Sequence, residues 1–470
     1  MRVTAQITMP AAMRQVSRLA LAGVAASALF AAATGAFAQE LPTLPTVEGP
    51  IASDADNMQH PSRRGPTLGQ ETPMEWPEAG EPDYFNYVED EFFISGESNG
   101  APYTTRIVFR HPADPEDFSG YVSIETLHPA QSAQTWMATR IGGMMNGHGY
   151  VEVVNTPGLI DSLKAYNGER YADLAIEGSQ TVEGQPDPAA NPIIAQAAYL
   201  MKTANPLGEE WNAAWMVMSG ASATSRTAMN FMTQENGNRA YEMDDGSSLI
   251  DAMYVWDTDG PSTEELADIY EVPVIILSTQ TEFMDGTRSF AQDSDAEGDQ
   301  YRLYQVAGMP HLESREMYEA GWQDCTMPID SFMYNAMVFQ GLDYMYNWLA
   351  EGEAPPMADR IAFEGDAEDS PIVLDEFGNA TGGVRSPQVE VPWETFSTPN
   401  DGGFVCTLMG VAEPLSEEQL ASLYDSPGDY AKQLTDATLR LIEEGWFPAE
   451  YLYELPKEIE RFADHMGSDE

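Results

Sequence analysis

The stretch from Trp215 to Met229 constrains the fold more than any other part of this chain. It begins with an apolar run, reaches Ser219 and Gly220, passes through small residues and resumes at helical spacing from Arg226. This order predicts a strand, a sharp turn and a helix. Gly220 leaves room for a tight backbone, and Ser222 lies at the tip of the turn, where its side chain points out of the sheet. The next helix would direct backbone N–H groups and the positive end of its dipole at whatever Ser222 attacks.

The turn differs at one position from the Gly-x-Ser-x-Gly pattern that presents a nucleophile. Thr224 stands where the second glycine is expected, although Ala221 and Ala223 still suit close packing. Two interpretations of Ser222 therefore remain: a catalytic nucleophile, or part of an ordinary small-residue turn between a strand and a helix. Residues further along the chain favour the nucleophile.

Strand and helix patterns alternate along the chain, which predicts an α/β protein with a mostly parallel, twisted central sheet flanked by helices. A helical stretch over residues 132–145 joins two strands as a β-α-β unit, and another helix begins at Asn191 with Pro192 in its first turn. Residues 157–187 show no regular pattern. Besides the run from Trp215, the predicted strands are residues 92–96, 105–109, 121–127, 149–154, 251–256, 272–277 and 301–306.

The end of the chain is predicted to be helical. Ser331 to Leu349 form a long helix, rich in aromatic residues and Met, that suits a protein core. Ser416 to Gln419 form a capping box, and an amphipathic helix follows that Gly445 ends. We expect an α/β core over residues 81–350 and a C-terminal extension, residues 351–470, packed on it.

The first 38 residues have the composition of a secretory signal. Three arginines, no acid, an apolar run from Leu19 to Ala33 and the sequence Ala36-Phe37-Ala38 predict cleavage after Ala38 and export to the periplasm or the medium. The apolar run is too short to span a bilayer, and no later run of about 18 apolar residues follows, so no membrane span is expected. Residues 39–80 are rich in Pro, Gly, Asp and Glu and predict an irregular leader segment.

Acidic residues dominate the charge of the chain. It has 76 Asp and Glu against 22 Lys and Arg, a formal net charge of −54. This charge excludes nucleic acid and anionic membrane surfaces as partners, because both are themselves negative. The acids are dispersed through a composition with 10% aromatic residues, which indicates a folded protein with a solvated acidic surface.

A serine nucleophile needs a base that takes its proton and a third group that orients the base. Of six histidines, only His311 lies in a loop that follows both the Ser222 turn and the last predicted strand, which gives the chain order serine, acid, histidine. The acid should follow a strand between them. Asp257 follows one strand, and Glu282 and Asp285 follow the next. We favour Glu282, which lies at the start of its loop, with Asp285 second.

Acyl transfer also requires N–H donors for the developing oxyanion. The backbone N–H of Ala223, directly after Ser222, is the first candidate. The second should come from the loop after the strand over residues 121–127, where we expect the backbone N–H of Leu127 or His128 to serve.

The chain has two cysteines, Cys325 and Cys406. In an oxidising compartment they would form one disulfide that closes a loop of about 80 residues and contributes at most about 4 kcal/mol; two free thiols are the alternative. Neither cysteine has a Cys-x-x-Cys or His-rich context, so we expect no metal site, and we expect no organic cofactor.

Five motifs together carry a resemblance to a known family. They are Tyr121-Val122-Ser123-Ile124-Glu125, Glu169-Arg170-Tyr171, Gly220-Ala221-Ser222-Ala223-Thr224, Arg302-Leu303-Tyr304-Gln305-Val306-Ala307-Gly308 with His311, and Gly378-Asn379-Ala380-Thr381-Gly382-Gly383-Val384-Arg385. On these motifs the chain resembles the secreted bacterial "alpha/beta hydrolase domain" proteins of the α/β-hydrolase superfamily. The resemblance implies an α/β-hydrolase fold, here with an N-terminal extension and a C-terminal helical addition. It carries the nucleophile, acid and base onto Ser222, Glu282 and His311.

These observations predict a secreted serine hydrolase that cleaves small-molecule carboxylic esters through an acyl-enzyme. One alternative is a binding protein that keeps the scaffold without activity, which the missing second glycine of the turn favours. Serine, acid and histidine in the required order favour the enzyme. A further alternative keeps all three residues but acts on amides or lactones.

Overall fold

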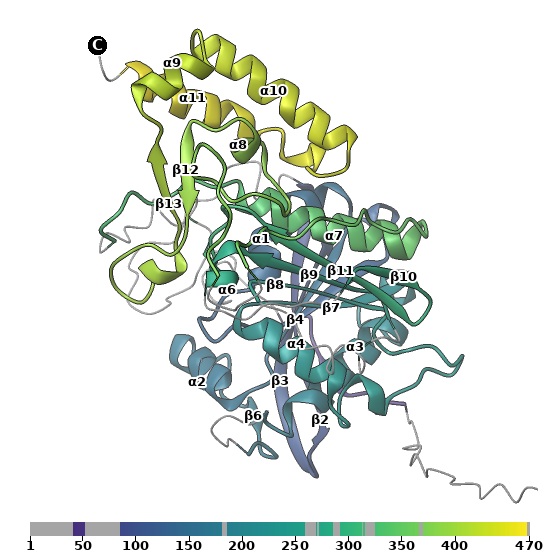
Figure 1. The fold of residues 1–470 in the computed structure, drawn as a ribbon. Helices are drawn as coiled ribbons and strands as arrows, with labels where there is room; N and C mark the ends of the chain where they lie inside the picture. Colours follow the sequence, from purple (N-terminus) through teal and green to yellow (C-terminus); the bar gives the residue numbers. More distant parts are fainter. Residues whose placement is uncertain are drawn as a thin grey trace, which may run out of the picture. The chain divides into compact units, whose positions relative to one another are not determined.

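A central sheet organises the described part of the chain, and its strands run in the order β1-β2-β3-β5-β4-β7-β8-β9-β11-β10, with β6 paired to β3 (Figure 1). The computed structural model describes residues 41–51, 85–180, 186–258, 269, 272–284, 292–312, 314, 325–365 and 370–467. All of them belong to the compact unit Ala38–Glu470. The strands of this sheet are β1 (Thr46–Glu48), β2 (Tyr87–Ser98), β3 (Ala101–Pro112), β4 (Tyr121–Thr126), β5 (Gly149–Val153), β6 (Ala175–Ile176), β7 (Trp215–Ala221), β8 (Ala252–Trp256), β9 (Val274–Thr279), β10 (Ser294–Ala296) and β11 (Asp299–Val306).

The middle of the sheet is parallel and its two ends are antiparallel. Strands β5, β4, β7, β8, β9 and β11 pair in parallel, whereas β1, β2, β3 and β6 at one end and β10 at the other pair antiparallel. Parallel strands need crossover connections, and helices supply them here. The predicted mostly parallel α/β sheet is therefore confirmed.

Each central strand contributes alternate side chains to two separate hydrophobic clusters. In β7, Met216 and Met218 belong to one cluster and Val217 to the other. In β9, Ile276 belongs to the first of these clusters and Ile275 to the second. Both faces of these strands are buried, which explains why they read as continuous apolar runs in the sequence.

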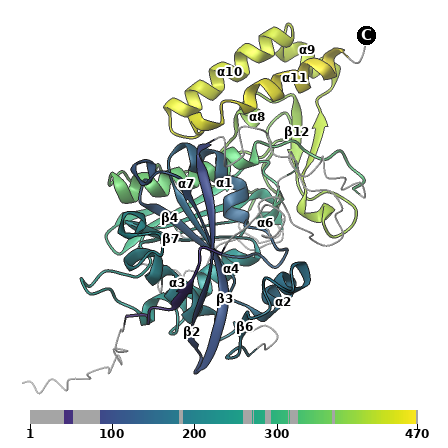
Figure 2. The ribbon, with the colours of Figure 1, turned by 180° about the vertical axis from the view of Figure 1, so that it is seen from behind.

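Helices cover both faces of the sheet. Residues of α2 (Pro157–Tyr166), α3 (Ala190–Thr203) and α4 (Ala223–Thr233) belong to the cluster on one face, and those of α1 (Gln134–Met145) and α7 (Tyr334–Ala350) to the cluster on the other. Figures 1 and 2 show α1 and α7 on the side opposite to α3 and α4. The remaining α-helices are α6 (Gln280–Met284), α8 (Pro387–Glu390), α9 (Glu417–Leu423), α10 (Pro427–Glu443) and α11 (Glu454–Gly467), and short 3-10 turns occupy Pro115–Asp117, Glu209–Trp211, Asn238–Ala240, Cys406–Leu408 and Ala449–Tyr451.

The C-terminal residues share the cluster that α7 builds. Tyr430 and Leu434 of α10 and Phe462 of α11 are fully buried in it. The predicted capping box is present, because the Ser416 side chain and Gln419 cap the start of α9 reciprocally. A separate two-stranded sheet, β12 (Glu394–Ser397) and β13 (Val411–Pro414), lies between α8 and α9 in the chain.

Two segments differ from the sequence prediction. Residues 157–166 form α2 rather than irregular structure; Pro157 begins this helix, where a missing N–H costs nothing, and Leu159, Ile160 and Leu163 are buried. Within the predicted irregular leader, Thr46–Glu48 form β1 and extend the sheet by pairing with β2. Residues 39, 40 and 52–80 of that leader and the predicted signal segment lie outside the described residues.

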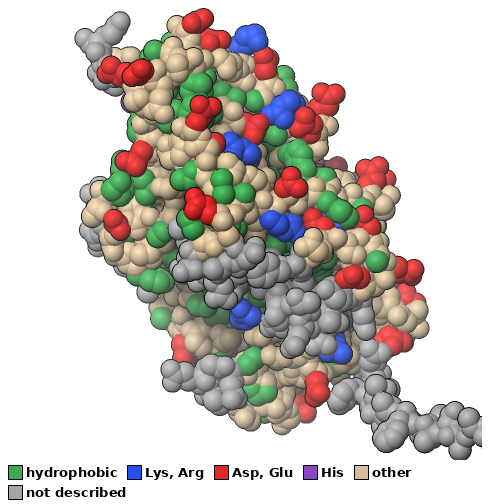
Figure 3. Space-filling model, in the orientation of Figure 1, with side chains coloured by type: hydrophobic (Ala, Val, Ile, Leu, Met, Phe, Trp, Pro, Cys, Tyr) green, Lys and Arg blue, Asp and Glu red, His purple; other side chains and the backbone are tan. Residues whose placement is uncertain are grey.

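Carboxylates are scattered over the face seen in Figure 3, with fewer basic side chains between them. The carboxylates do not cluster over any one element of that face, which agrees with the dispersed acids of the sequence. None of the helices in the described part of the chain is long and apolar enough to cross a bilayer.

Candidate active site

Ser222 lies in the sharp turn that the sequence predicts, between the end of β7 and the start of α4. Its backbone has φ 53° and ψ −117°, a conformation that glycine adopts readily and other residues rarely. At Gly220 an added Cβ would lie 2.5 Å from both the carbonyl carbon and the oxygen of Thr224, so glycine is required there. The local sequence thus allows the chain to turn sharply enough to present the Ser222 hydroxyl.

Thr224 occupies the position of the expected second glycine without disturbing the turn. Its hydroxyl accepts a hydrogen bond from the Ala221 N–H (2.8 Å) and donates to Oε1 of Glu125 (2.9 Å). Glu125 is fully buried and also accepts from the Thr135 N–H and the Tyr150 hydroxyl. Burial raises the pKa of Glu125 to about 7. The threonine therefore ties the turn to β4, a function that the sequence pattern alone did not indicate.

The structure brings Ser222, His311 and Glu282 together. Nε2 of His311 lies 2.9 Å from Oγ of Ser222, and Nδ1 lies 2.5 Å from Oε1 of Glu282. With Nδ1–H donating to the carboxylate, Nε2 is left as the acceptor for the serine proton. The three side chains follow β7, β9 and β11, whose carboxyl ends meet at one edge of the parallel sheet.

Both partners of Ser222 are fixed by local hydrogen bonds. The other oxygen of Glu282 accepts from the N–H of Thr279 at 3.1 Å and from the hydroxyl of the same residue. The His311 N–H donates to the hydroxyl of Thr281 (3.0 Å). The acid thus lies in the short helix α6 directly after β9, rather than in an extended loop, and α6 positions both it and the histidine.

Asp257, one of the alternative acids, makes no hydrogen bond to His311 in the described structure. It follows β8 and is buried, one oxygen accepts from the hydroxyl of Tyr334, and the other has no hydrogen-bond partner among the described residues. Burial, opposed in part by nearby His311, raises its pKa to about 8. A carboxyl group that stays protonated near neutral pH is a poor partner for an imidazolium. The other alternative, Asp285, lies outside the described residues.

The three predicted oxyanion donors differ in whether the backbone N–H already has a hydrogen-bond partner. The Ala223 N–H is in the first turn of α4 beside Ser222 and, within the described residues, donates to no carbonyl. The Leu127 N–H donates to the Val153 carbonyl at 2.9 Å, and the His128 N–H donates to the Ser132 carbonyl at 3.1 Å. In this structure both N–H groups are therefore already paired with carbonyls, that of Leu127 with strand β5 and that of His128 within its own loop.

Three of the other histidines, His111, His148 and His465, contact aromatic rings rather than this group. His60 lies outside the described residues, while His111 stacks on Phe109, His148 contacts Tyr121 and His465 contacts Trp393.

Cys325 and Cys406 form a disulfide with a Cα–Cα distance of 5.3 Å. The pairing expected from the sequence is thus present in the structure. Among the described residues, no group of three or more His, Cys, Asp or Glu side chains is arranged to hold a metal ion.

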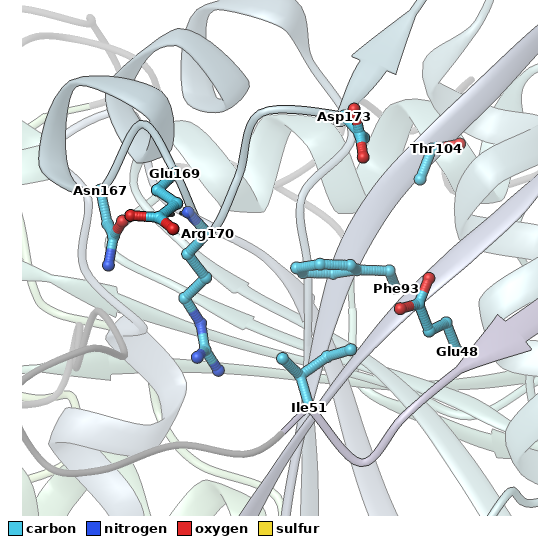
Figure 4. Close-up of a pocket in the computed structure, with 8 residues that line it drawn as sticks. All are labelled: Glu48, Ile51, Phe93, Thr104, Asn167, Glu169, Arg170 and Asp173. Atoms are coloured by element: carbon cyan, nitrogen blue, oxygen red, sulfur yellow. Dashed lines mark hydrogen bonds between the residues drawn. The ribbon is translucent and has the colours of Figure 1, made fainter.

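A pocket of about 540 Å³ lies among the antiparallel strands and the segment after α2 (Figure 4). Three of its eight lining residues are acidic, and its one guanidinium, that of Arg170, donates to the buried Glu91 carboxylate at 2.7 Å. None of the candidate catalytic side chains lines it. The lining residues are Glu48, Ile51, Phe93, Thr104, Asn167, Glu169, Arg170 and Asp173.

The sequence matches the family model described as "Alpha/beta hydrolase domain" over residues 47–455. The chain belongs to this family. The α/β-hydrolase fold that the five motifs implied is therefore confirmed. A separate comparison with curated proteins found no match. In this hydrolase the family match covers the strand ends that carry Ser222, Glu282 and His311 as well as most of the C-terminal extension.

Several solved structures are similar to this hydrolase at low identity. Esterase Est22 is 13% identical, over 43% of this chain and 68% of that chain, with a TM-score of 0.26. A cold-adapted esterase from an Arctic intertidal metagenomic library is 13% identical, over 49% and 89% of the two chains, with a TM-score of 0.25. A Klebsiella pneumoniae protein assigned as a dienelactone hydrolase is 11% identical, over 56% and 99%, with a TM-score of 0.31.

Proposed function

We propose that this protein is a serine hydrolase that cleaves carboxylic esters through an acyl-enzyme on Ser222. The observation that carries the proposal is the hydrogen-bonded series from Oγ of Ser222 through His311 to Glu282, with the serine in a strained turn at the start of a helix. A serine in an ordinary turn would not need a histidine Nε2 at 2.9 Å from its Oγ, nor a carboxylate that binds Nδ1 of the same ring.

In the acylation step, Oγ of Ser222 bonds to the ester carbonyl carbon while its proton moves to Nε2 of His311. The carbonyl electron pair moves onto oxygen, which the Ala223 N–H stabilises. Glu282 holds the imidazole in its working tautomer and stabilises the imidazolium that forms. The bond to the alcohol then breaks as His311 returns the proton to the leaving oxygen, and water repeats the sequence on the acyl-enzyme.

The structure weakens the case for a catalytically silent binding protein. That interpretation rested on the missing second glycine, and Thr224 is accommodated there by hydrogen bonds to Ala221 and Glu125. We further propose that the protein is exported; the disulfide between Cys325 and Cys406 suits an oxidising compartment.

A fluorophosphonate probe and small p-nitrophenyl esters test the ester hydrolase proposal. The folded protein should be labelled at Ser222, and Ser222→Ala should lose both labelling and turnover. Thr227→Ala is the matched control, because it removes a hydroxyl from the same helix whose contact is with the Ala223 carbonyl. Folded wild type that is neither labelled nor active on esters of short and medium acyl length would contradict the proposal.

A further inference from the structure

The loop after β4 folds into a tight turn that its own hydrogen bonds close. The Gln131 N–H donates to the His128 carbonyl (2.7 Å), and the His128 N–H donates to the Ser132 carbonyl (3.1 Å). Pro129, which lacks an N–H, lies between them. The backbone donors that such a loop would offer to an oxyanion are thus used within the turn.

The same turn orients the imidazole of His128. Nδ1 accepts a hydrogen bond from the Ala130 N–H at 3.0 Å, so in the neutral ring the proton is on Nε2. Burial and the neighbouring His311 lower the pKa of His128 to about 4, which keeps the ring neutral at physiological pH. Nε2 is not fully enclosed and makes no hydrogen bond to the described residues. His128 therefore presents an N–H donor that has no partner among the described residues.

His128 lies at the same strand end as Ser222. Strands β4 and β7 are parallel neighbours with Ile124 opposite Met218, and His128 and Ser222 each follow that pair by four residues. A positive charge on His311 disfavours protonation of His128. The register of these strands therefore brings the His128 loop and the Ser222 turn to the same edge of the sheet.

We propose that the Nε2–H of His128 is the second oxyanion donor, acting together with the backbone N–H of Ala223. This inference rests on the proposed ester hydrolysis. When Ser222 attacks, the carbonyl oxygen gains the electron pair and accepts both hydrogen bonds; His128 keeps its proton throughout, and His311 alone transfers one. A neutral His128 also avoids repelling His311 while that ring carries its transient positive charge.

The test compares His128→Phe, which keeps a flat ring without the donor, with His128→Gln, which restores an N–H near the position of Nε2. His128→Phe should lower kcat/KM for p-nitrophenyl butyrate by about 10²- to 10³-fold, the usual effect of losing one oxyanion donor. An alkyl trifluoromethyl ketone, whose adduct with Ser222 carries an oxyanion, should bind more weakly by a similar factor. His128→Gln should recover at least about tenfold of both losses. His128→Ala replaces the Phe variant if the latter lacks a cooperative melting transition.

Turnover by His128→Phe within about threefold of wild type would overturn the inference. A loss of turnover without weaker binding of the trifluoromethyl ketone would also overturn it, because that result indicates a structural role. Wild type that neither reacts with the fluorophosphonate nor cleaves esters would overturn the proposed function and this inference together. An active wild type with an active His128→Phe overturns only the role of His128.

Discussion

The strained backbone at Ser222 predicts an unusual order of stability for two inactive variants: Ser222→Gly should be more stable than Ser222→Ala. With φ 53° and ψ −117°, Ser222 has the conformation of the first central residue of a type II′ turn, which favours glycine. Holding a residue with a Cβ in such a region costs on the order of 1–3 kcal/mol. Both variants lose the hydroxyl and its hydrogen bond to His311, so that loss cancels in the comparison.

The glycine variant also has a cost, because its unfolded chain is more flexible. That effect opposes folding by roughly 0.5–1 kcal/mol relative to alanine. Subtracting it from the strain leaves a net advantage of about 1 kcal/mol for Ser222→Gly. Urea unfolding followed by tryptophan fluorescence would measure the difference from the two midpoints at a common slope.

Ser225 provides the matched control for this comparison. It lies in α4 three residues after Ser222 and has an ordinary helical backbone, so Ser225→Gly should be less stable than Ser225→Ala by about 1 kcal/mol. The sign of the Gly-versus-Ala difference should therefore reverse between the two positions. If Ser222→Gly were less stable than Ser222→Ala by as much as Ser225→Gly is less stable than Ser225→Ala, the turn would store no strain. That result would refute the reasoning.

Two further predictions concern Glu125 and the disulfide. Because burial raises the pKa of Glu125 from 4.5 to about 7, the folded state holds a proton that the unfolded state releases, and stability from this group falls as pH rises through that window. Between pH 4 and pH 8, the unfolding free energy of Glu125→Gln should therefore rise by about 3 kcal/mol relative to that of wild type. A difference between the two unfolding free energies that does not change with pH would contradict this assignment. Replacing Cys325 and Cys406 by Ser should lower the unfolding free energy by about 2–4 kcal/mol, and an unchanged urea midpoint would show that the disulfide contributes nothing in solution.

The catalytic candidates could be predicted because they depend on chain order. In a parallel sheet every strand end of one sense reaches the same edge, so residues after β7, β9 and β11 had to lie near one another. Chain order alone did not distinguish Glu282 from Asp257, because both follow parallel strands. The structure distinguishes their surroundings: Glu282 lies 2.5 Å from Nδ1 of His311, whereas Asp257 accepts a hydrogen bond from Tyr334 of α7.

The oxyanion donors could not be predicted in the same way. Whether a backbone N–H is available depends on where its own hydrogen bond goes. The partner of Leu127 is the Val153 carbonyl at the end of β5, and that of His128 is the Ser132 carbonyl in the same loop. The contact between Thr224 and Glu125 was missed for a similar reason, since it joins residues 99 positions apart. Local patterns predicted the sharp turn that carries Ser222, but they carried no information about these long-range partners.

The glycine-rich motif over residues 378–385 joins the C-terminal extension to the strand that precedes His311. The Val384 N–H and carbonyl pair with Gln305 and Ala307 at the end of β11. A Cβ on Gly383, which has φ +67°, would lie 2.5 Å from the Gln305 carbonyl, so this approach requires glycine. The Leu312 N–H donates to the Leu408 carbonyl, two residues beyond the disulfide cysteine Cys406. The segment that carries His311 is thus held on both sides by residues after position 380, and these contacts give the motif a structural role in placing the imidazole.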